Sequence, residues 1–222
     1  MSSLLKNRDG ARAECENRNN MGITIRLEKE NDYRIVEYLT REAFWNLYKP
    51  GCVEHLLIHK MRKVPAFVKE LSFVAVAEEK IVGNIVYSKA KILNSTNKEF
   101  EVLCMGPVGV LPSYQGQGIG SRLITYSIAK ARQLGYKAII LFGNQNYYQR
   151  FGFVNAKAYG IQTSSGENFA EFMALELYDG GLKGISGKFY EDEVFKIAEE
   201  ELEIFDKEFP PKEKRVTDTQ LI

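Results

Sequence analysis

The chain has 222 residues, of which 45% are hydrophobic, so it is long enough to bury one substantial core. Its 30 basic and 29 acidic side chains nearly cancel, which argues against a nucleic acid or a membrane as partner. No apolar run is long enough to span a membrane, and the N-terminus lacks the apolar core of a signal peptide. We therefore expect a cytoplasmic protein.

The cysteines and histidines do not form a recognisable metal or disulfide pattern. Cys15, Cys52 and Cys104 are odd in number and widely spaced, which predicts neither a disulfide framework nor a zinc site. His55 and His59 can share a helix face, but the residue after His55 is not the glutamate of the H-E-x-x-H motif. The sequence therefore predicts no metal site.

Composition divides the chain into three parts. Residues 1–20 are polar and predict a disordered extension, with the natural start at either Met1 or Met21. Residues 21–180 carry strand and helix patterns and predict the main domain. Residues 181–222 predict a C-terminal extension with an amphipathic helix, which packs on the core, covers a functional site or makes a homodimer contact.

Hydrophobic periodicity predicts the elements of the chain in order. Gly106-Pro107 interrupts one strand and predicts a bulge or splay there, because proline lacks the backbone N–H of a sheet ladder. Asn31 is the expected N-cap of the first helix. The expected strands cover residues 23–27, 71–77, 81–92, 100–110, 138–142, 161–162 and 171–178, and the expected helices cover residues 31–44, 54–61, 120–134 and 194–209.

The most informative stretch joins the strand that ends at Val110 to the helix that follows. Gly116, Gly118 and Gly120 lie in this strand–turn–helix segment, where backbone N–H groups and the helix dipole favour a phosphate. A dinucleotide fingerprint would need a third glycine where Ser121 stands. A P-loop would need Gly-Lys-Ser/Thr at the helix start, which is also absent.

The pattern that remains is Gln115-x-x-Gly118-x-Gly120, preceded by Val110-x-Pro112. It closely resembles the acetyl-CoA signature of the GNAT family of N-acetyltransferases. In that family the loop amides bind the CoA pyrophosphate, and the glycines let the backbone approach it closely.

A second segment resembles the same family. Tyr147 and Tyr148 shortly precede Gly152-Phe153, after the strand-like run 138–142. GNAT proteins carry a tyrosine at this place, on the short helix after the fifth strand. The resemblance is clearest over residues 100–155 and extends more weakly over residues 23–178.

The resemblance implies an α/β (α+β) fold of the GNAT type for residues 21–180. Its central sheet is mixed, mostly antiparallel and twisted, has splayed parallel central strands, and is flanked by helices. The pantetheine arm of acetyl-CoA enters the gap between those strands and pairs with main-chain groups, as an added strand would.

The resemblance also implies roles for individual residues. The Val108 N–H polarises the thioester carbonyl, and Tyr148 protonates the departing thiolate, with Tyr147 as the fallback. Arg122 either meets a phosphate or is solvated. The residues implied to bind the co-substrate acetyl-CoA are Val108, Gly109, Val110, Gln115, Gly116, Gln117, Gly118, Ile119, Gly120, Ser121, Asn144 and Tyr148.

The implied reaction is acetyl transfer to a primary amine of a small molecule or protein, by direct attack in a ternary complex. The alternative is a non-catalytic acyl-CoA-binding or sensing module. Glu54, Glu70 and His55 are candidate general bases, a water chain serves equally well, and none is assigned. We interpret Cys104 as a small buried residue rather than a nucleophile. The acceptor and the oligomeric state are not readable from the sequence.

Overall fold

A long antiparallel hairpin forms the centre of the fold in the computed structural model, which describes residues 22–218 and residue 220. Its strands are β3 (Lys80–Leu93) and β4 (Glu99–Val110). The described residues form one sheet in the order β1-β2-β3-β4-β5-β8-β6, and β9 pairs with both β3 and β7. The other strands are β1 (Thr24–Leu27), β2 (Phe73–Ala77), β5 (Ala138–Phe142), β6 (Val154–Asn155), β7 (Ile161–Gln162), β8 (Phe172–Glu176) and β9 (Gly187–Tyr190).

The pairing within this sheet confirms the predicted fold class. Strands β4 and β5 pair in parallel, as do β7 and β9, and the other named pairs are antiparallel. The sheet is therefore mixed and mostly antiparallel, with a parallel pair near its centre. Strand β5 has the bounds predicted from the sequence.

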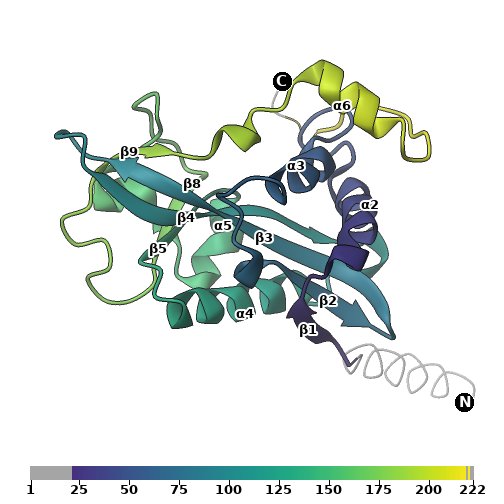
Figure 1. Ribbon diagram of the computed structural model, residues 1–222, viewed down its shortest axis with the longest axis horizontal. Helices are drawn as coiled ribbons and strands as arrows, with labels where there is room; N and C mark the ends of the chain where they lie inside the picture. Colours follow the sequence, from purple (N-terminus) through teal and green to yellow (C-terminus); the bar gives the residue numbers. More distant parts are fainter. Residues whose placement is uncertain (1–21, 219, 221–222) are drawn as a thin grey trace, which may run out of the picture.

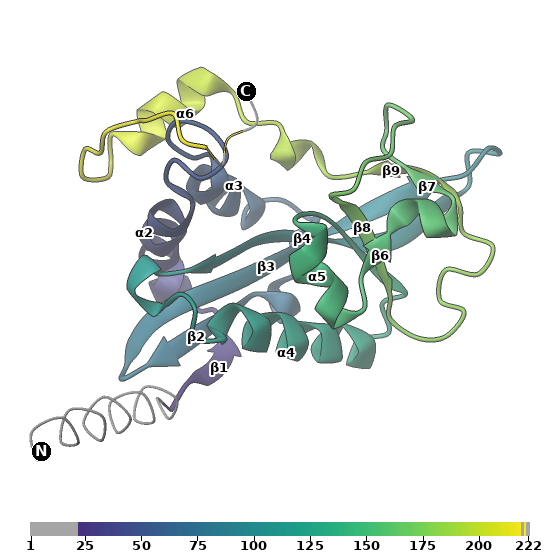
Figure 2. The same cartoon turned by 180° about the vertical axis from the view of Figure 1, so that it is seen from behind.

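Helices cover both faces of the sheet (Figures 1 and 2). Helices α2 (Tyr33–Phe44) and α3 (Glu54–Met61) lie on one face, and α6 (Glu199–Asp206) lies on the outer side of α3. Helices α4 (Ile119–Gln133) and α5 (Gln145–Tyr148) lie on the other face. Short 3-10 turns are η1 (Glu30–Asp32), η2 (Lys69–Leu71), η3 (Pro112–Tyr114), η4 (Gln149–Phe151), η5 (Ala156–Tyr159) and η6 (Glu193–Phe195).

Apolar side chains hold both layers to the sheet. On α4, Leu123 and Ile124 are buried and pack against the sheet. Leu134, which helical spacing also predicts on the apolar stripe, follows the end of α4 and is 42% exposed. On the opposite face, Val36 and Leu39 of α2 pack with Ile58 of α3. Burying one such side chain contributes about 1.5–3 kcal/mol, so these contacts set where both helix layers lie.

The first helix differs from its prediction at its start and on its buried face. Asn31 lies inside η1, and Asp32 stands at the N-cap of α2 instead. The Asp32 carboxylate is drawn there because it accepts the Lys29 N–H at 2.8 Å and pairs with Arg26 at 2.6 Å. Helical spacing in the sequence predicts Ile35 on the same apolar stripe as Val36 and Leu39, but Ile35 is 50% exposed. The predicted burial of Ile35 was wrong because charged residues occupy part of the buried face of α2.

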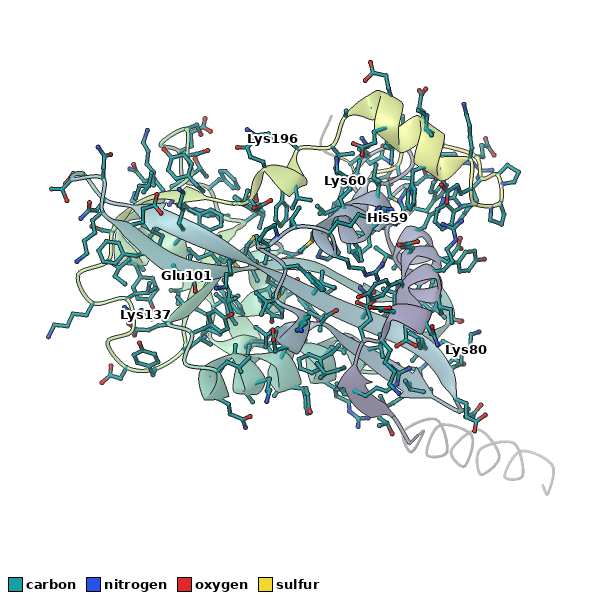
Figure 3. The ribbon with its side chains drawn as sticks, viewed as in Figure 1. His59, Lys60, Lys80, Glu101, Lys137 and Lys196 are labelled. Atoms are coloured by element: carbon teal, nitrogen blue, oxygen red, sulfur yellow. The ribbon has the colours of Figure 1, made fainter. Side chains whose placement is uncertain are left out.

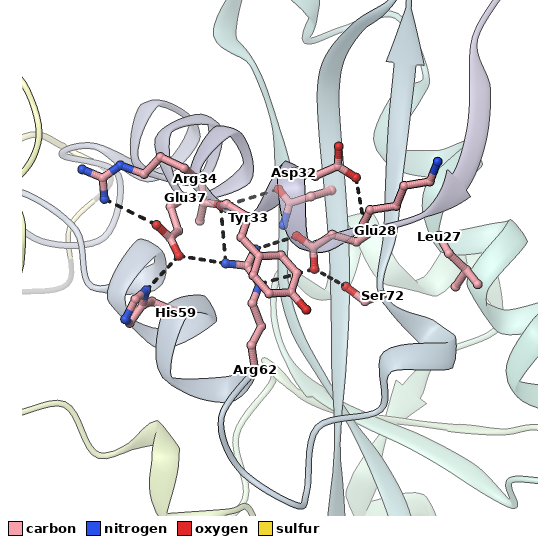
Figure 4. Close-up of polar contacts among 12 residues, drawn as sticks. Leu27, Glu28, Asp32, Tyr33, Arg34, Glu37, His59, Arg62 and Ser72 are labelled. Atoms are coloured by element: carbon pink, nitrogen blue, oxygen red, sulfur yellow. Dashed lines mark hydrogen bonds and ion pairs between the residues drawn. The ribbon is translucent and has the colours of Figure 1, made fainter.

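These charged residues form a buried cluster between α2, α3 and the end of β1 (Figure 4). The Arg62 guanidinium lies between Glu28, at 2.5 Å, and Glu37, at 2.9 Å, and stacks 4.1 Å from the Tyr33 ring. The His59 Nδ1 lies 2.9 Å from Glu37 Oε1. All three partners of Arg62 come from outside α3, so the cluster fixes α3 against the neighbouring elements.

The predicted C-terminal helix over residues 194–209 is broken in two. Val194 lies in η6, and α6 begins only at Glu199. Asp192 caps the first turn by accepting the Val194 N–H at 2.9 Å, and Ala198 is extended, so the helical backbone stops between them. The periodicity still identified buried residues, because Leu202 and Phe209 pack on α3.

Helix α6 is tied to α3, and the segment after α6 returns along the end of α2. Lys60 of α3, labelled beside His59 in Figure 3, pairs with Glu201 at 2.6 Å. The Trp45 indole N–H donates to the Glu213 carbonyl at 3.0 Å, and Lys212 pairs with Glu42 at 2.9 Å. The C-terminal segment is therefore part of the helical layer over this face.

Candidate active site

Strands β4 and β5 separate shortly after they meet. They pair only at Leu103–Ile139 and Cys104–Ile140, although β4 continues to Val110. The predicted bulge is present at the same place, because Gly106-Pro107 oppose Val86 alone on β3. The splay of the two parallel strands is thereby confirmed, and it opens the sheet beside the second half of β4.

The alternation of backbone groups along β4 decides what faces this gap. The Leu111 N–H donates to the Val82 carbonyl of β3 at 2.9 Å. Because backbone polar groups point to alternate sides of a strand, Gly109 also turns toward β3, whereas Val108 and Val110 turn away from it. The backbone groups of Val108 and Val110 therefore face the gap.

The glycine loop places a set of unpaired donors beside α4. Gly116 and Gly118 have φ of +74° and +76°, a conformation that other residues adopt only at a cost, and Gly118 is the N-cap of α4. The Arg122 N–H donates to the Gly118 carbonyl at 3.0 Å, but the N–H groups of residues 116–121 make no hydrogen bond to any described residue. An anion could satisfy these donors.

Three polar side chains of this region bind the protein itself. Gln115 donates to the Val110 carbonyl at 3.0 Å, and Gln117 donates to the Ser113 carbonyl at 3.4 Å. Arg122, for which the sequence left two roles open, donates to the Ile23 carbonyl of the first strand region at 2.9 Å. These contacts stabilise the loop and leave its backbone as the group available to a ligand.

Helix α5 presents both tyrosines to the gap. The Asn144 side chain caps α5 by accepting the Asn146 N–H at 2.9 Å. The Tyr147 hydroxyl lies only 3.1 Å from where a Cβ on Gly120 would be. The Tyr148 ring packs so closely on Gly143 that a Cβ there would overlap the ring. This ring position therefore requires a residue without a Cβ at position 143.

The environment keeps the Tyr148 phenol protonated. Burial, helped by neighbouring Tyr48 and Tyr147, raises the pKa of Tyr148. Its ring packs edge-on against Tyr147, with centroids 5.1 Å apart, and against Phe153, at 5.7 Å. A neutral phenol held by packing can donate its proton to a group in the gap.

One cleft of about 730 Å³ lies at the gap between β4 and β5, beside the glycine loop and α5. It brings together seven residues predicted from the sequence: Val108, Val110, Gln115, Gly120, Asn144, Tyr147 and Tyr148. The remaining predicted residues, Gly109, Gly116, Gln117, Gly118, Ile119 and Ser121, are not among its lining side chains and backbone. Ile119 is buried against the sheet, and a Cβ on Gly109 would lie 2.6 Å from Asn84 Oδ1.

Of the three candidate general bases predicted from the sequence, Glu54 alone lines the cleft. Burial raises the pKa of the Glu54 carboxyl. Glu70 is exposed on η2, away from the cleft lining. His55 is fully buried outside the cleft lining, and burial lowers its pKa to about 4. Sequence reasoning missed a second carboxyl in the cleft, Glu191, whose pKa burial also raises.

Cys104 borders the cleft as a buried, protonated thiol. It is 1% exposed, and burial raises its pKa well above the ordinary value. Within residues 22–218, no three histidine, cysteine, aspartate or glutamate side chains gather closely enough to hold a metal ion. None of the helices in that part of the chain is long and apolar enough to cross a membrane.

Comparison with known proteins gives consistent results. The sequence model of the acetyltransferase (GNAT) family matches residues 41–153. The uncharacterized N-acetyltransferase YjhQ of Escherichia coli K12 is 35% identical over 131 residues, which cover 59% of this chain and 69% of YjhQ. The uncharacterized N-acetyltransferase YhbS of the same strain is 26% identical over 166 residues, covering 74% of this chain and 93% of YhbS.

Two solved structures share the fold over most of the chain. The crystal structure of Escherichia coli YhbS in complex with CoA has a TM-score of 0.70 and 25% identity, covering 78% of this chain and 91% of YhbS. A GNAT acetyltransferase from Brucella melitensis, in complex with acetyl-CoA, has a TM-score of 0.63 and 27% identity. That match covers 80% of this chain and 100% of the Brucella chain.

Proposed function

The chain belongs to the GNAT family of acetyltransferases, and from this premise we propose that it transfers the acetyl group of acetyl-CoA to a primary amine. The proposal is supported by the two relatives that were crystallised with CoA and with acetyl-CoA. The observation that carries it is the pairing of β4 with β5 at two positions only, with the unpaired N–H groups of residues 116–121 beside the same cleft.

The residues fit the two ends of the coenzyme differently. The backbone donors of residues 116–121, at the positive end of α4, suit a pyrophosphate. The gap-facing backbone groups of Val108 and Val110 suit the amide groups of a pantetheine arm, which would pair with them as a short strand. In this arrangement the thioester end reaches the part of the cleft that Tyr148 lines.

The protein would then assist a direct attack. The bound co-substrate supplies an acetyl thioester, whose carbonyl carbon forms a bond to the neutral amine nitrogen as its bond to sulfur breaks. The Val108 N–H would polarise the carbonyl oxygen, and preorganised donors of this kind contribute several kcal/mol. The Tyr148 phenol would donate its proton to the departing thiolate.

Single substitutions at the two tyrosines test these roles. Tyr148→Phe keeps the ring but removes the proton donor, so we expect kcat to fall by about 100-fold while the Kd for CoA changes less than about twofold. Tyr147→Phe is the matched control, and kcat should stay near the wild-type value. The measurements are CoA-SH release with an amine panel and calorimetry with CoA.

Each contrary result has a distinct meaning. A wild-type kcat in Tyr148→Phe, with a large loss in Tyr147→Phe, would move the acid role to Tyr147. CoA binding without CoA-SH release from any amine would favour the acyl-CoA-binding module. Absence of CoA binding by the wild-type protein would overturn the proposed function as a whole.

A further inference from the structure

One wall of the cleft is formed by segments other than β4, the glycine loop and α5, to which the proposed coenzyme contacts belong. It comprises the C-terminal end of α2, the start of α3 and the chain after β9, and we call it the acceptor wall. Its members used below are Phe44, Tyr48, Glu54, Glu191 and Phe195. Helices α2 and α3 lie on the opposite face of the sheet from α5, so the cleft runs through the gap between β4 and β5 (Figures 1 and 2).

The charges in the cleft are of one sign. Glu54 and Glu191 are the charged residues among the described residues that line it, and no described lysine or arginine lines it. The Glu54 carboxylate accepts the Val53 N–H at 2.9 Å. Glu54 is half-buried, and burial raises the pKa of its carboxyl, so it lacks part of the solvation that an exposed carboxylate has. Glu191 is exposed at the edge of the cleft, where partial desolvation also raises its pKa.

The two lysines that act electrostatically on these carboxyls pair with residues outside the cleft lining. Lys49, which acts on Glu54, lies 3.7 Å from the exposed Glu199. Lys196, which acts on Glu191, pairs with Glu193 at 2.7 Å, and Figure 3 shows Lys196 at the outer edge of the molecule. A cation that enters the cleft would therefore supply the partner that the two carboxylates lack.

The rest of the acceptor wall is aromatic. Phe44 and Tyr48 come from α2 and the turn after it, with ring centroids 6.2 Å apart, and Phe195 comes from η6. Phe142 continues this surface at the end of β5, where it stacks on Phe169 with centroids 5.9 Å apart. Aromatic faces bury an apolar body and also attract a cation, so they complement the two carboxylates.

We propose that the acceptor is a primary ammonium carried on an apolar or aromatic body without a carboxylate beside the nitrogen, and that Glu54 accepts its proton. This inference rests on the proposed function and names the substrate class of the same cleft. A carboxylate next to the nitrogen would meet two carboxylates of the same sign, the half-buried Glu54 and the exposed Glu191, and like charges repel each other.

The proton transfers balance over one turnover. The ammonium gives one proton to the Glu54 carboxylate, and the resulting neutral amine attacks the thioester carbon. The Tyr148 phenol protonates the thiolate, and the second proton of the attacking nitrogen returns to the Tyr148 phenolate through solvent. Glu54 then releases its proton to bulk water, so that one proton leaves for each acetyl group transferred.

The groups around Glu54 set its pH dependence. Tyr48, Lys49 and Cys52 are the titratable groups that interact electrostatically with the Glu54 carboxyl. The Tyr48 phenol and the Cys52 thiol are both protonated near neutral pH, because desolvation raises their pKa. Lys49 is the cation among them. A base with a raised pKa stays protonated at low pH, so kcat/KM should rise with pH through that pKa.

A matched amine series tests the substrate class. Phenethylamine and phenylalaninamide lack the carboxylate of phenylalanine, and phenylalaninamide is close to phenylalanine in size. We expect kcat/KM for phenylalaninamide to exceed that for phenylalanine by at least about 100-fold, as a like charge placed beside two carboxylates, one of them half-buried, implies. Equal values for the two would overturn the inference about the substrate class.

Variants test the two carboxylates separately. Glu54→Gln should lower kcat by about 100-fold, as loss of a general base does, and remove the acidic limb of the kcat/KM profile. Glu191→Gln should raise KM for the amine by about tenfold and narrow the preference for phenylalaninamide. Glu193→Gln, on an exposed carboxylate outside the cleft, is the control and should match the wild type.

The outcomes separate this inference from the proposed function. A wild-type kcat and pH profile in Glu54→Gln would overturn the role of Glu54. CoA-SH release with spermidine or an aminoglycoside, but with none of the apolar amines, would keep the acetyltransferase and overturn the acceptor class. CoA binding should be unchanged in all three variants, which calorimetry verifies independently of turnover.

Discussion

The two sides of the cleft are built in different ways. On the coenzyme side, the groups that face a ligand are backbone N–H and C=O groups of β4 and the glycine loop. On the acceptor side they are side chains, carried by helices that buried charges and the C-terminal segment hold in place. A backbone site depends on glycines at fixed local spacing, whereas a side-chain site depends on residues that meet only after folding.

The support of the acceptor side lies behind the cleft, under α6. Arg41 of α2 is fully buried, donates from Nε to Asp206 at 2.7 Å, and stacks 4.1 Å from the Trp45 ring. Its other two nitrogens have no hydrogen-bond partner among the described residues. His55 Nε2 lies 3.3 Å from the same Asp206 carboxylate, and its Nδ1 lies 3.4 Å from the Cys52 sulfur. Asp206 is therefore the anion on which this layer depends.

The largest expected effect follows from removing that anion. Asp206→Ala leaves the buried Arg41 without its ionic partner, and breaking a buried pair in this way costs about 3–5 kcal/mol. Urea unfolding should show this loss. Glu208→Ala removes an exposed partner of Arg34 and should cost less than about 0.5 kcal/mol. Equal losses of unfolding free energy in the two variants would contradict the view that buried charges hold the helices of the acceptor side in place.

A smaller effect should appear on acidification. Because burial lowers the pKa of His55 from 6.5 to about 4, the unfolded chain binds this proton between those values and the folded chain does not. Stability should fall by about 2 kcal/mol between pH 6.5 and pH 5 from this group, at about 1.4 kcal/mol per pH unit. His55→Gln should show a shallower decline over the same range, and an unchanged slope would exclude His55 as the cause.

The coenzyme side should respond to backbone strain instead. Gly118→Ala adds a methyl group that meets no atom within 4 Å but must hold φ near +76°, which costs about 1–2 kcal/mol. We expect the Kd for CoA to rise about tenfold. Gly135→Ala places the same strain, at φ +81° and in open space, at the far end of α4. Calorimetry should find its CoA affinity unchanged, and equal weakening in both variants would contradict a local effect.

The smallest effect should come from Arg122. Its guanidinium donates to the Ile23 carbonyl rather than standing free for a phosphate. Arg122→Gln should therefore change the Kd for CoA by less than about twofold at physiological ionic strength. A tenfold loss that disappears in high salt would show instead that this side chain binds phosphate directly and that the coenzyme side is not built from backbone alone.

Local patterns predicted the elements and the backbone half of the site. Strand β5 and helix α3 have their predicted bounds, and the bulge at Gly106-Pro107 follows from the missing N–H of proline. The glycine spacing predicted the turn at Gly118, because the conformation of a turn depends on a few residues that are adjacent in sequence.

The acceptor side could not be predicted in the same way. Asp206 and Arg41 are 165 residues apart, and no local pattern pairs them. Glu191 follows β9, which itself pairs with β3 across the sheet, so its place in the cleft is a product of topology. Charged residues on α2 also disrupted the apolar stripe, since a periodicity analysis places Arg41 and Glu37 on a solvent face.

The two buried thiols have a practical consequence for measuring turnover. Cys52 is 4% exposed and Cys104 is 1% exposed, and burial raises the pKa of both, so neither presents a thiolate near neutral pH. A colorimetric disulfide reagent should therefore react with liberated CoA-SH much faster than with either side chain while the fold is intact. Cys15 lies outside the described residues, and a Cys15→Ser variant would leave those two shielded thiols as the only thiols of the chain. In one assay of that variant, the rapid colour change would measure CoA-SH release, and slow labelling of the protein thiols would measure unfolding.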